Sequence, residues 1–305
     1  MGRTSDQRVY QPGLAGFAAA LLVSAAAFVA DAADPWGDRL RSFTPGATAG
    51  FGAADLPDIV LGPPEGAGEN EGSFHVVSLG SGGGIEVVFT NNVVEDGPGD
   101  DLVVFENAFR VSDDGAVFDE LAWVEVSRDG REYFRFPFDV ETGDGLAGRA
   151  PVLANSSNEL DPLDPLSGGD RFDLADVGLD YVRYVRIVDG GDTLADFGNL
   201  AFPGTKGGFD LDAIGAVNSL RTVRVRGKVS AQGVPIQGLR VVLRGTSDGR
   251  KRWRRTNAQG CFRFARLIPD GEVIVRAFGR ELGRSREVRA LSSAQSRVDL
   301  EMELE

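Results

Sequence analysis

The sequence predicts an all-β protein in which an antiparallel β-sandwich is followed by a smaller, seven-stranded β-sandwich. Helical periodicity is hard to find after residue 32, and short runs that are apolar, or that alternate between apolar and polar residues, recur along the chain. Turns rich in Gly, Pro, Asn and Asp separate these runs. Many short strands joined by such turns are typical of sandwiches built from antiparallel sheets.

The N-terminus has the features of a secretory signal peptide. Arg3 and Arg8 precede a 17-residue apolar run, residues 14–30, and Ala30-Asp31-Ala32 resembles a cleavage site. We therefore predict a signal peptide over residues 1–32 and a secreted or cell-surface protein with no membrane span after its removal. An uncleaved anchor is the alternative, because the run is only a little shorter than the ~20 residues of a membrane helix.

The charge distribution divides the remaining chain into two predicted domains. Residues 33–220 carry 11 Lys+Arg and 35 Asp+Glu, a balance of -24, whereas residues 221–305 carry 19 Lys+Arg and 9 Asp+Glu, a balance of +10. Such asymmetry indicates domains with different surroundings or partners, and it also allows the two halves to attract each other.

The first domain contains seven runs with strand character. They cover residues 74–79, 85–90, 102–105, 121–127, 131–137, 181–189 and 209–217. The run 102–105 is short, β-branched and aromatic, which favours a strand buried on both faces. Residues 139–170 show little periodicity and are expected to form a long loop, which inside a domain is often functional.

The second domain also contains seven such runs. They cover residues 222–229, 239–245, 250–256, 261–265, 272–278, 285–291 and 296–304. The run 250–256 begins RKRWRR, a basic stretch with an interleaved tryptophan. It indicates either a patch for an acidic envelope polysaccharide or lipid headgroups, or an ordinary solvated face that docks on the acidic first domain. Because we expect export, nucleic acid is not a predicted partner.

The first domain resembles galactose-binding-like jelly-roll domains at YVRYVRI (181–187) and GFDLDAIGAV (208–217). Together with GPGDDLVVFENAF, WVEVSRDG and GGDRFDL, these segments resemble a group of secreted bacterial cell-surface proteins over residues 61–218. The resemblance implies a jelly-roll sandwich that binds carbohydrate, often with a structural calcium ion.

The second domain resembles carboxypeptidase regulatory-like domains, which have a transthyretin-like sandwich fold. VRGKVSAQGVPIQGLRVVLRG and TNAQGCFRFARLIPDGEVIVRA carry the resemblance, with Asp270-Gly271 in place of a single glycine and Val273 at an aromatic position. Such domains are accessory modules in exported proteins, so the resemblance implies no peptidase activity.

The residue inventory gives little support to catalysis. His75 is the single histidine and Cys261 the single cysteine, so neither a His-based zinc site nor an intramolecular disulfide can form. We predict no catalytic residues. A pair of carboxylates that hydrolyses extracellular polysaccharide is the alternative, since two acids about 5–10 Å apart are sufficient for glycoside hydrolysis.

Calcium is the cofactor that the acidic residues favour. Calcium takes six to eight oxygen ligands. Glu106 is in register with Leu102 and Val104, so it is expected to point inward, where a carboxylate needs a cation or an arginine such as Arg183 or Arg186. The two acids of FDLDAIGAV alternate with apolar residues and are expected on one strand face. The predicted ligands are Asp100, Asp101, Glu106, Asn107, Asp210 and Asp212.

Taken together, the sequence predicts an exported, non-catalytic protein that binds an extracellular glycan or another cell-envelope component with the help of structural calcium. Trp123, Tyr133, Tyr181 and Tyr184 are candidate sugar-stacking residues, although Trp123 is flanked by apolar residues typical of a core strand. A purely structural envelope protein without a small ligand is the remaining alternative.

Overall fold

The structure is a computed structural model, which describes residues 34–110, 117–194, 208–247, 249–278, 287–291 and 297–304. The predicted signal peptide, residues 1–32, lies outside these residues. Within them, no helix combines the length and the apolar character needed to cross a membrane. Strands dominate, and the α-helical element α1 (Gly191–Leu194) has four residues. The predicted all-β class is therefore confirmed.

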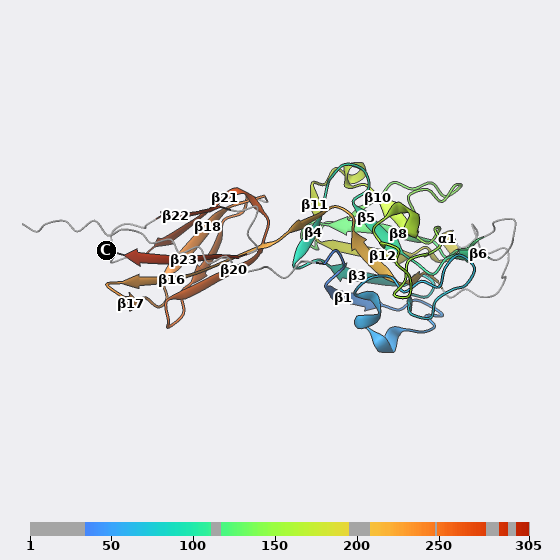
Figure 1. Ribbon diagram of the computed structural model, residues 1–305, viewed down its shortest axis with the longest axis horizontal. Helices are drawn as coiled ribbons and strands as arrows, with labels where there is room; N and C mark the ends of the chain where they lie inside the picture. Colours follow the sequence, from blue (N-terminus) through green and yellow to red (C-terminus); the bar gives the residue numbers. More distant parts are fainter. Residues whose placement is uncertain are drawn as a thin grey trace, which may run out of the picture.

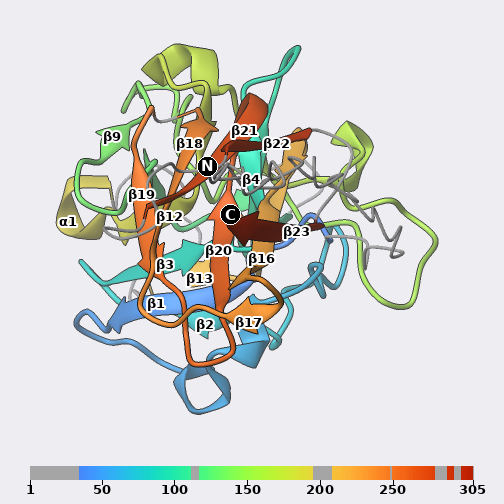
Figure 2. The same ribbon diagram turned by 90° about the vertical axis from the view of Figure 1, so that its left-hand side faces the viewer.

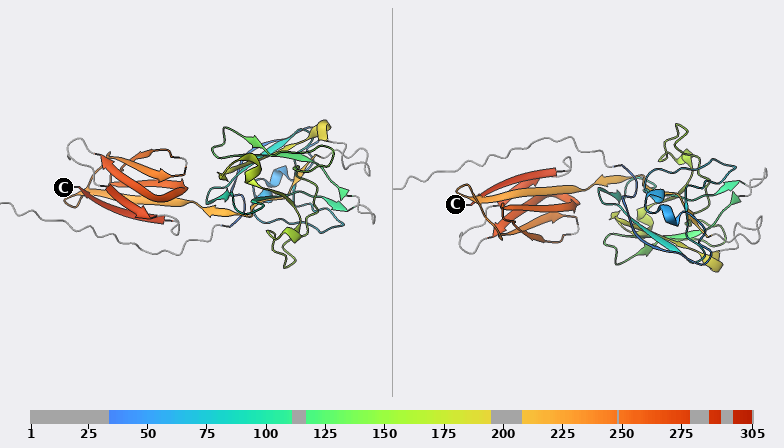
Figure 3. Two further views of the ribbon diagram at one scale, coloured as in Figure 1. Left: turned by 90° about the horizontal axis from the view of Figure 1, so that it is seen from above. Right: turned by 90° about the horizontal axis from the view of Figure 1, so that it is seen from below.

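The described chain forms two lobes that lie end to end along the long axis of the molecule (Figures 1 and 3). Strand β16 (Val223–Ala231) begins where the two lobes meet and runs into the second one. Looking along the long axis, the sheets of the second lobe lie in front of the first (Figure 2). We call the two lobes the first and second domains.

The described residues of the first domain form fifteen short strands and four 3-10 helices in addition to α1. The strands are β1 (Arg39–Thr44), β2 (Val77–Ser78), β3 (Gly84–Val88), β4 (Asn92–Glu95), β5 (Leu102–Phe105), β6 (Phe109–Arg110), β7 (Val117–Phe118), β8 (Ala122–Ser127), β9 (Phe134–Arg135), β10 (Asp170–Phe172), β11 (Tyr181–Val182), β12 (Tyr184–Asp189), β13 (Asp210–Leu211), β14 (Ala213–Ala216) and β15 (Ser219–Arg221). The 3-10 helices are η1 (Ala53–Asp55), η2 (Asp58–Val60), η3 (Pro165–Ser167) and η4 (Leu174–Val177).

These strands form a sandwich with antiparallel pairing. The largest sheet has the order β1-β3-β12-β8-β9, and a second sheet has the order β10-β5-β14. Smaller sheets, β11-β4-β15, β13-β2 and β6-β7, extend the edges. Apolar side chains from the two main sheets, including Val87, Val124, Ile187, Val104 and Ile214, belong to one buried cluster, so the sheets enclose a common core.

Strand β5 lies at the centre of its sheet and is buried on both faces, as predicted. Leu102 and Val104 belong to the core between the two main sheets, whereas Val103 and Phe105 belong to a second cluster with Trp36. All four residues of β5 are 0% exposed. The period of two places Glu106 on the same side as Leu102 and Val104, and Glu106 is also buried.

Four of the strands predicted for the first domain differ from the observed ones. The runs 74–79 and 131–137 contain only the two-residue strands β2 and β9, and the runs 181–189 and 209–217 are each divided, into β11 and β12 and into β13 and β14. The division of 181–189 arises because β11 pairs with β4 whereas β12 pairs with β3 and β8, so the chain changes sheets at Arg183. The sequence pattern is continuous across this point and does not indicate the change of partner.

All seven strands predicted for the second domain are present, with one additional two-residue strand. They are β16, β18 (Arg240–Thr246), β19 (Arg252–Arg255), β20 (Cys261–Leu267), β21 (Pro269–Phe278), β22 (Glu287–Leu291) and β23 (Arg297–Leu304), and the addition is β17 (Val234–Pro235). One sheet has the order β17-β16-β20 with β23 beside β16, and the other has the order β19-β18-β21-β22. The pairing of β16 with β23 is parallel, whereas the other strand pairs of this domain are antiparallel in the described residues.

The two domains have separate cores and a small shared contact. The cluster of the second domain begins at Val223, immediately after Thr222, whose backbone N–H still donates to the Asn91 carbonyl of the first domain. Across the junction, Ile268 packs with Val93 and Tyr181. The junction between the domains is therefore formed in part by apolar contact.

Candidate metal centre

The six predicted ligands lie at the two ends of strand β5. Asp100 and Asp101 precede the strand, whereas Glu106 and Asn107 follow it. Antiparallel pairing of β14 with β5, in which Ala213 lies opposite Phe105, brings residues 210–212 to the second end. Because five residues of extended chain span about 16 Å, Asp101 and Glu106 are too far apart to bind one ion. The six residues therefore do not form a single site.

At the first end, Asp101 serves as a structural acceptor. Its Oδ1 accepts hydrogen bonds from Gly97 N at 2.7 Å and from Asn218 Nδ2 at 2.8 Å, and its Oδ2 accepts from Leu174 N at 2.8 Å. Among the described residues, Asp96, Asp101 and Asp173 form a group of three acids whose carboxylate oxygens lie within 4.8 Å of one another. Asp101 is already fully hydrogen-bonded, however, and Asp173 accepts from Ala175 N at the start of η4.

Replacing Asp101 by alanine should lower the free energy of unfolding by roughly 2–4 kcal/mol, because it removes three hydrogen bonds to a buried carboxylate and leaves backbone donors unpaired. Urea denaturation followed by circular dichroism measures the change. Asp100→Ala is the matched control, since Asp100 is exposed and should change stability by less than about 0.5 kcal/mol. Equal effects of the two substitutions would contradict this role for Asp101.

At the second end, three buried acids meet beside the half-buried amide of Asn107. Glu106 is 1% exposed and accepts hydrogen bonds from the backbone N–H groups of Asn107 and Asp210. Asp210, at 7% exposed, accepts from the side chains of Ser78 and Asn107. Glu120, at 8% exposed, accepts from Gly208 N at 2.9 Å. We call Glu106, Asp210 and Glu120 the carboxylate centre.

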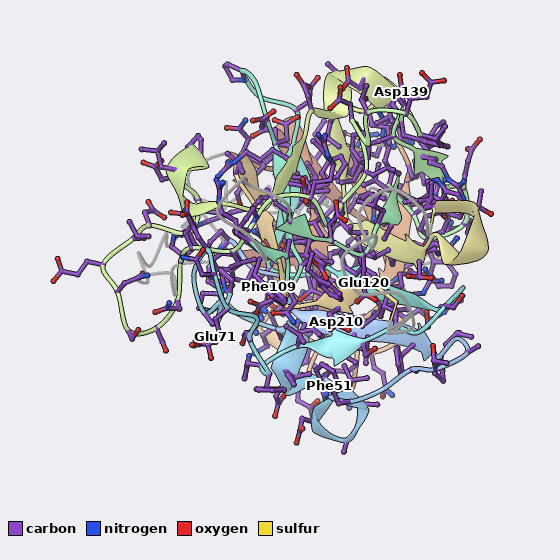
Figure 4. All side chains as sticks on the ribbon, turned by 90° about the vertical axis from the view of Figure 1, so that its right-hand side faces the viewer. Phe51, Glu71, Phe109, Glu120, Asp139 and Asp210 are labelled. Atoms are coloured by element: carbon purple, nitrogen blue, oxygen red, sulfur yellow. The ribbon has the colours of Figure 1, made fainter. Side chains whose placement is uncertain are left out.

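The carboxylate centre lies away from the second domain. Figure 4 looks at the first domain from the end opposite to the second domain, and Glu120 and Asp210 lie close together near the middle of that view. Strand β6, which follows Glu106, marks the same end in Figure 1.

Electrostatics in the carboxylate centre disfavour the ionised state of its acids. Burial raises the pKa of Glu106 well above its ordinary value, and the neighbouring Asp210 and Glu120 raise it further. Burial likewise raises the pKa of Asp210 to about 6. Without a compensating positive charge, the protonated form of Glu106 is therefore favoured, whereas Asp210, with a pKa of about 6, is largely ionised at neutral pH.

Two oxygen atoms in the carboxylate centre have no hydrogen-bond partner among the residues that the structure describes. They are Glu106 Oε2 and Asp210 Oδ1, both buried. Neither arginine considered as an alternative partner for Glu106 fills this role. Arg183 donates to the carbonyl of Arg266, and Arg186 pairs with Glu86 and Glu125. A buried carboxylate oxygen without a partner requires a proton or a cation.

Asp212 lies next to this centre and has its own partner. Both of its carboxylate oxygens accept a hydrogen bond from Glu65 N, at 3.1 and 3.0 Å. Burial raises the pKa of Asp212 to about 8, and the carboxylate of Glu65 adds to this shift. Asp210 and Asp212 thus lie in the same region, but their side chains bind different groups.

Two acids of this region were not predicted from the sequence. Glu120 had no signal, because it stands before the apolar run 121–124 without a register that ties it to a strand. The sequence does contain a signal for Asp189, because Asp189 continues the alternation of Val185 and Ile187. Its side chain is therefore directed to the core, where it is buried. Its carboxylate accepts from Gly82 N, Gly191 N and Phe209 N, so it joins three loops.

The four candidate sugar-stacking aromatics have arginines over their rings. The guanidinium carbon of Arg135 lies 4.3 Å from the ring centre of Trp123, that of Arg186 3.5 Å from Tyr133, that of Arg128 5.3 Å from Tyr181, and that of Arg41 4.9 Å from Tyr184. These are cation–π pairs. Each aromatic ring therefore has one face occupied by the protein itself.

Comparison with known proteins identifies the second domain. Residues 224–303 match the family model of the carboxypeptidase regulatory-like domain. This match confirms the resemblance stated for the second sandwich, and we call it the regulatory-like domain below. It covers a minority of the chain and leaves the first domain unassigned. No curated protein matches the chain.

Several solved structures of bacterial pilins show a weak similarity. The pilus 2b backbone protein of group B streptococcus is 10% identical, with a TM-score of 0.24 over 75% of this chain and 93% of that chain. BcpA, the major pilin subunit of Bacillus cereus, is 10% identical, with a TM-score of 0.23 over 79% and 67% of the two chains. The T6 backbone pilin of Streptococcus pyogenes serotype M6 is 11% identical, with a TM-score of 0.24 over 75% and 50%. TM-scores this low carry no argument about function.

Proposed function

We propose that this is an exported, non-catalytic cell-surface protein that binds carbohydrate or another envelope component, and that calcium bound at the carboxylate centre stabilises its first domain. The signal-like residues 1–32 and an accessory family domain support the first part. The observation that carries the calcium proposal is the pair of buried oxygens without partners, Glu106 Oε2 and Asp210 Oδ1.

The chemistry of the donor set fits calcium better than a transition metal. Glu106, Asp210 and Glu120 offer hard oxygen ligands, and no histidine or cysteine takes part. The three acids do not meet the 4.8 Å separation found for Asp96, Asp101 and Asp173. The bound ion would supply the positive charge that allows the acids to ionise.

The burial of the carboxylate centre argues against the hydrolase alternative. A glycosidase must present two carboxyl groups to a sugar that reaches both. Glu106 and Asp210 are 1% and 7% exposed, so a sugar has no access to their oxygens in this geometry. The centre is better suited to a small ion than to a substrate.

Thermal unfolding in millimolar calcium and in chelator tests the calcium proposal. At calcium concentrations about 100-fold above Kd, the native state should gain about 3 kcal/mol, which raises the melting temperature by roughly 5–10 °C. Glu106→Gln should abolish this gain. In chelator the same variant should be more stable than the wild type by about 1–3 kcal/mol, since it removes an unsatisfied acid from the core.

Asp173→Asn is the matched control for this experiment. It removes an acid from the other carboxylate group, near η4, and should leave the calcium response intact. If Asp173→Asn lost the stabilisation by calcium and Glu106→Gln retained it, the calcium site would lie at the first end of β5. An unchanged wild-type midpoint at millimolar calcium would exclude a stabilising calcium site.

A further inference from the structure

A cleft separates the two domains beside their apolar contact. Its volume is about 460 Å³, within the range of sites that bind small molecules. Residues of β11 and β12 and of the turn after β8 form one wall, and residues of the regulatory-like domain around β19 and Ile268 form the other. The shared cluster of Ile268, Val93 and Tyr181 holds the two walls together.

Arginines dominate the charge of this cleft. The lining includes five arginines, Arg128, Arg183, Arg250, Arg252 and Arg266, and two acids, Asp129 and Glu132. The difference, five minus two, is a net charge of +3. An acidic first domain would be expected to meet the basic domain with its acids, and Asp129 does pair with Arg250 at 3.8 Å. Arg128 and Arg183 of the first domain nevertheless add positive charge to the same cleft.

Arg183 is the central residue of the cleft. It is half-buried, and its Nη2 donates to the Arg266 carbonyl at 2.7 Å. Among the residues that the structure describes, it forms no ion pair with a carboxylate. Burial lowers the pKa of Arg183, and the charges of Arg266 and Arg252 lower it further. The remaining donors of this guanidinium therefore lack a negative partner.

The backbone conformation of Arg266 is a second feature of this cleft that is typical of ligand sites. Its φ angle is 58°, in the left-handed region that residues other than glycine rarely adopt. The same residue supplies the carbonyl that holds Arg183. Backbone strain of this kind is common at ligand sites, where the surrounding structure maintains it.

We propose that this cleft binds an acidic polysaccharide through carboxylate groups on its sugar units. Arginine pairs with carboxylates through two parallel hydrogen bonds, and the hydroxyl groups of Tyr184, Thr246 and Ser247 line the same space. Asp129 and Glu132 provide acceptors for sugar hydroxyls. The proposal deepens the proposed role in binding envelope carbohydrate and does not depend on the calcium centre.

The geometry disfavours two other anionic partners. A membrane surface is flat and does not enter a cleft between two domains. Single-stranded nucleic acid is usually bound by open aromatic rings on which bases stack. Here Arg128 and Arg41 already lie over the rings of Tyr181 and Tyr184, and the two acids of the cleft repel a dense row of phosphates.

Isothermal titration of the full chain with oligogalacturonate tests the proposal, with its fully methyl-esterified form as the uncharged comparison. We expect binding of the acidic oligosaccharide, which weakens with salt, and none of the ester. Arg183→Gln should weaken binding roughly 10- to 100-fold, since it removes a charge-assisted pair. Arg250→Gln, an exposed cleft position that is safe for folding, should weaken it about tenfold.

Arg254→Gln is the control, because Arg254 lies on the same strand, β19, but outside the cleft. It should change the affinity less than about twofold. The proposal is overturned if oligogalacturonate does not bind, or if Arg254→Gln weakens binding as much as Arg250→Gln. It is also overturned if phosphatidylglycerol vesicles or single-stranded DNA bind more tightly in an Arg183-dependent manner. Thermal unfolding of the same arginine variants with calcium and with chelator tests the carboxylate centre independently. The polysaccharide proposal and the calcium proposal can therefore fail separately.

Discussion

Replacing Phe105 by alanine should lower the free energy of unfolding of the first domain by about 3–5 kcal/mol. Phe105 is 0% exposed and its ring centre lies 6.3 Å from that of Trp36. It also belongs to the second cluster of the domain, with Val103, Val152 and Ala213. Truncation therefore removes apolar contacts and leaves a cavity in the middle of the sheet that carries the carboxylate centre.

Urea denaturation monitored by tryptophan fluorescence and by circular dichroism measures this loss. Phe74→Ala is the control, since Phe74 is 89% exposed and its truncation should change stability by less than about 0.5 kcal/mol. If the two substitutions have the same effect, β5 is not the central strand of a packed core. Because Phe105 precedes Glu106, we also expect the calcium response to weaken in Phe105→Ala.

The second large effect is a loss of stability with rising pH in chelator, caused by Asp212. Its pKa is about 8 in the folded protein, against 3.8 for an unperturbed aspartate, the value expected in the unfolded chain. Between these values the folded state binds more protons than the unfolded state, so stability falls as pH rises. The loss begins near pH 4 and is complete above pH 8. Each pKa unit corresponds to about 1.4 kcal/mol, so the loss from Asp212 is at most about 6 kcal/mol.

Burial of Asp212 sets the direction of this effect, and the charge of Glu65 adds to it. Glu65 is the charged group that contributes to its shift, and Glu106 and Asp210, whose pKa values are also raised, act in the same direction on stability. Asp212→Asn retains an oxygen to accept from Glu65 N and should flatten the stability profile between pH 5 and pH 8. Asp100→Asn, at an exposed position, should leave it unchanged. If the free energy of unfolding depended on pH in the same way for Asp212→Asn and the wild type, the pKa of Asp212 would not be raised in the folded protein.

The calcium and pH experiments are linked. A cation at the carboxylate centre favours the ionised acids, so the gain in stability from calcium should increase as pH rises. The stability of the calcium-free protein should be highest in mild acid, where the buried acids are protonated. These two pH dependences distinguish a specific cation site from a general effect of ionic strength, which acts mainly on exposed charges.

Some features of this protein follow from local sequence. The alternation of apolar and polar residues predicted strands such as β16, β18 and β20 of the regulatory-like domain, because buried residues of the core alternate in them with more exposed ones. The same period of two correctly directed Glu106 inward, since Leu102 and Val104 define the buried face. Such inferences succeed because they depend on directions within one strand.

Tertiary structure alone decided which side chains meet. The antiparallel pairing of β14 with β5 placed Asp210 next to Glu106, and the length of β5 separated both from Asp101. Arg183 lies where the chain changes sheets, and its side chain donates to the Arg266 carbonyl in the cleft between the domains instead of to Glu106. Periodicity tells on which face of a strand a side chain lies, but the distance between residues of different strands depends on pairing and register. For that reason the kinds of groups in the carboxylate centre were predictable, whereas its membership and the arginine cleft were not.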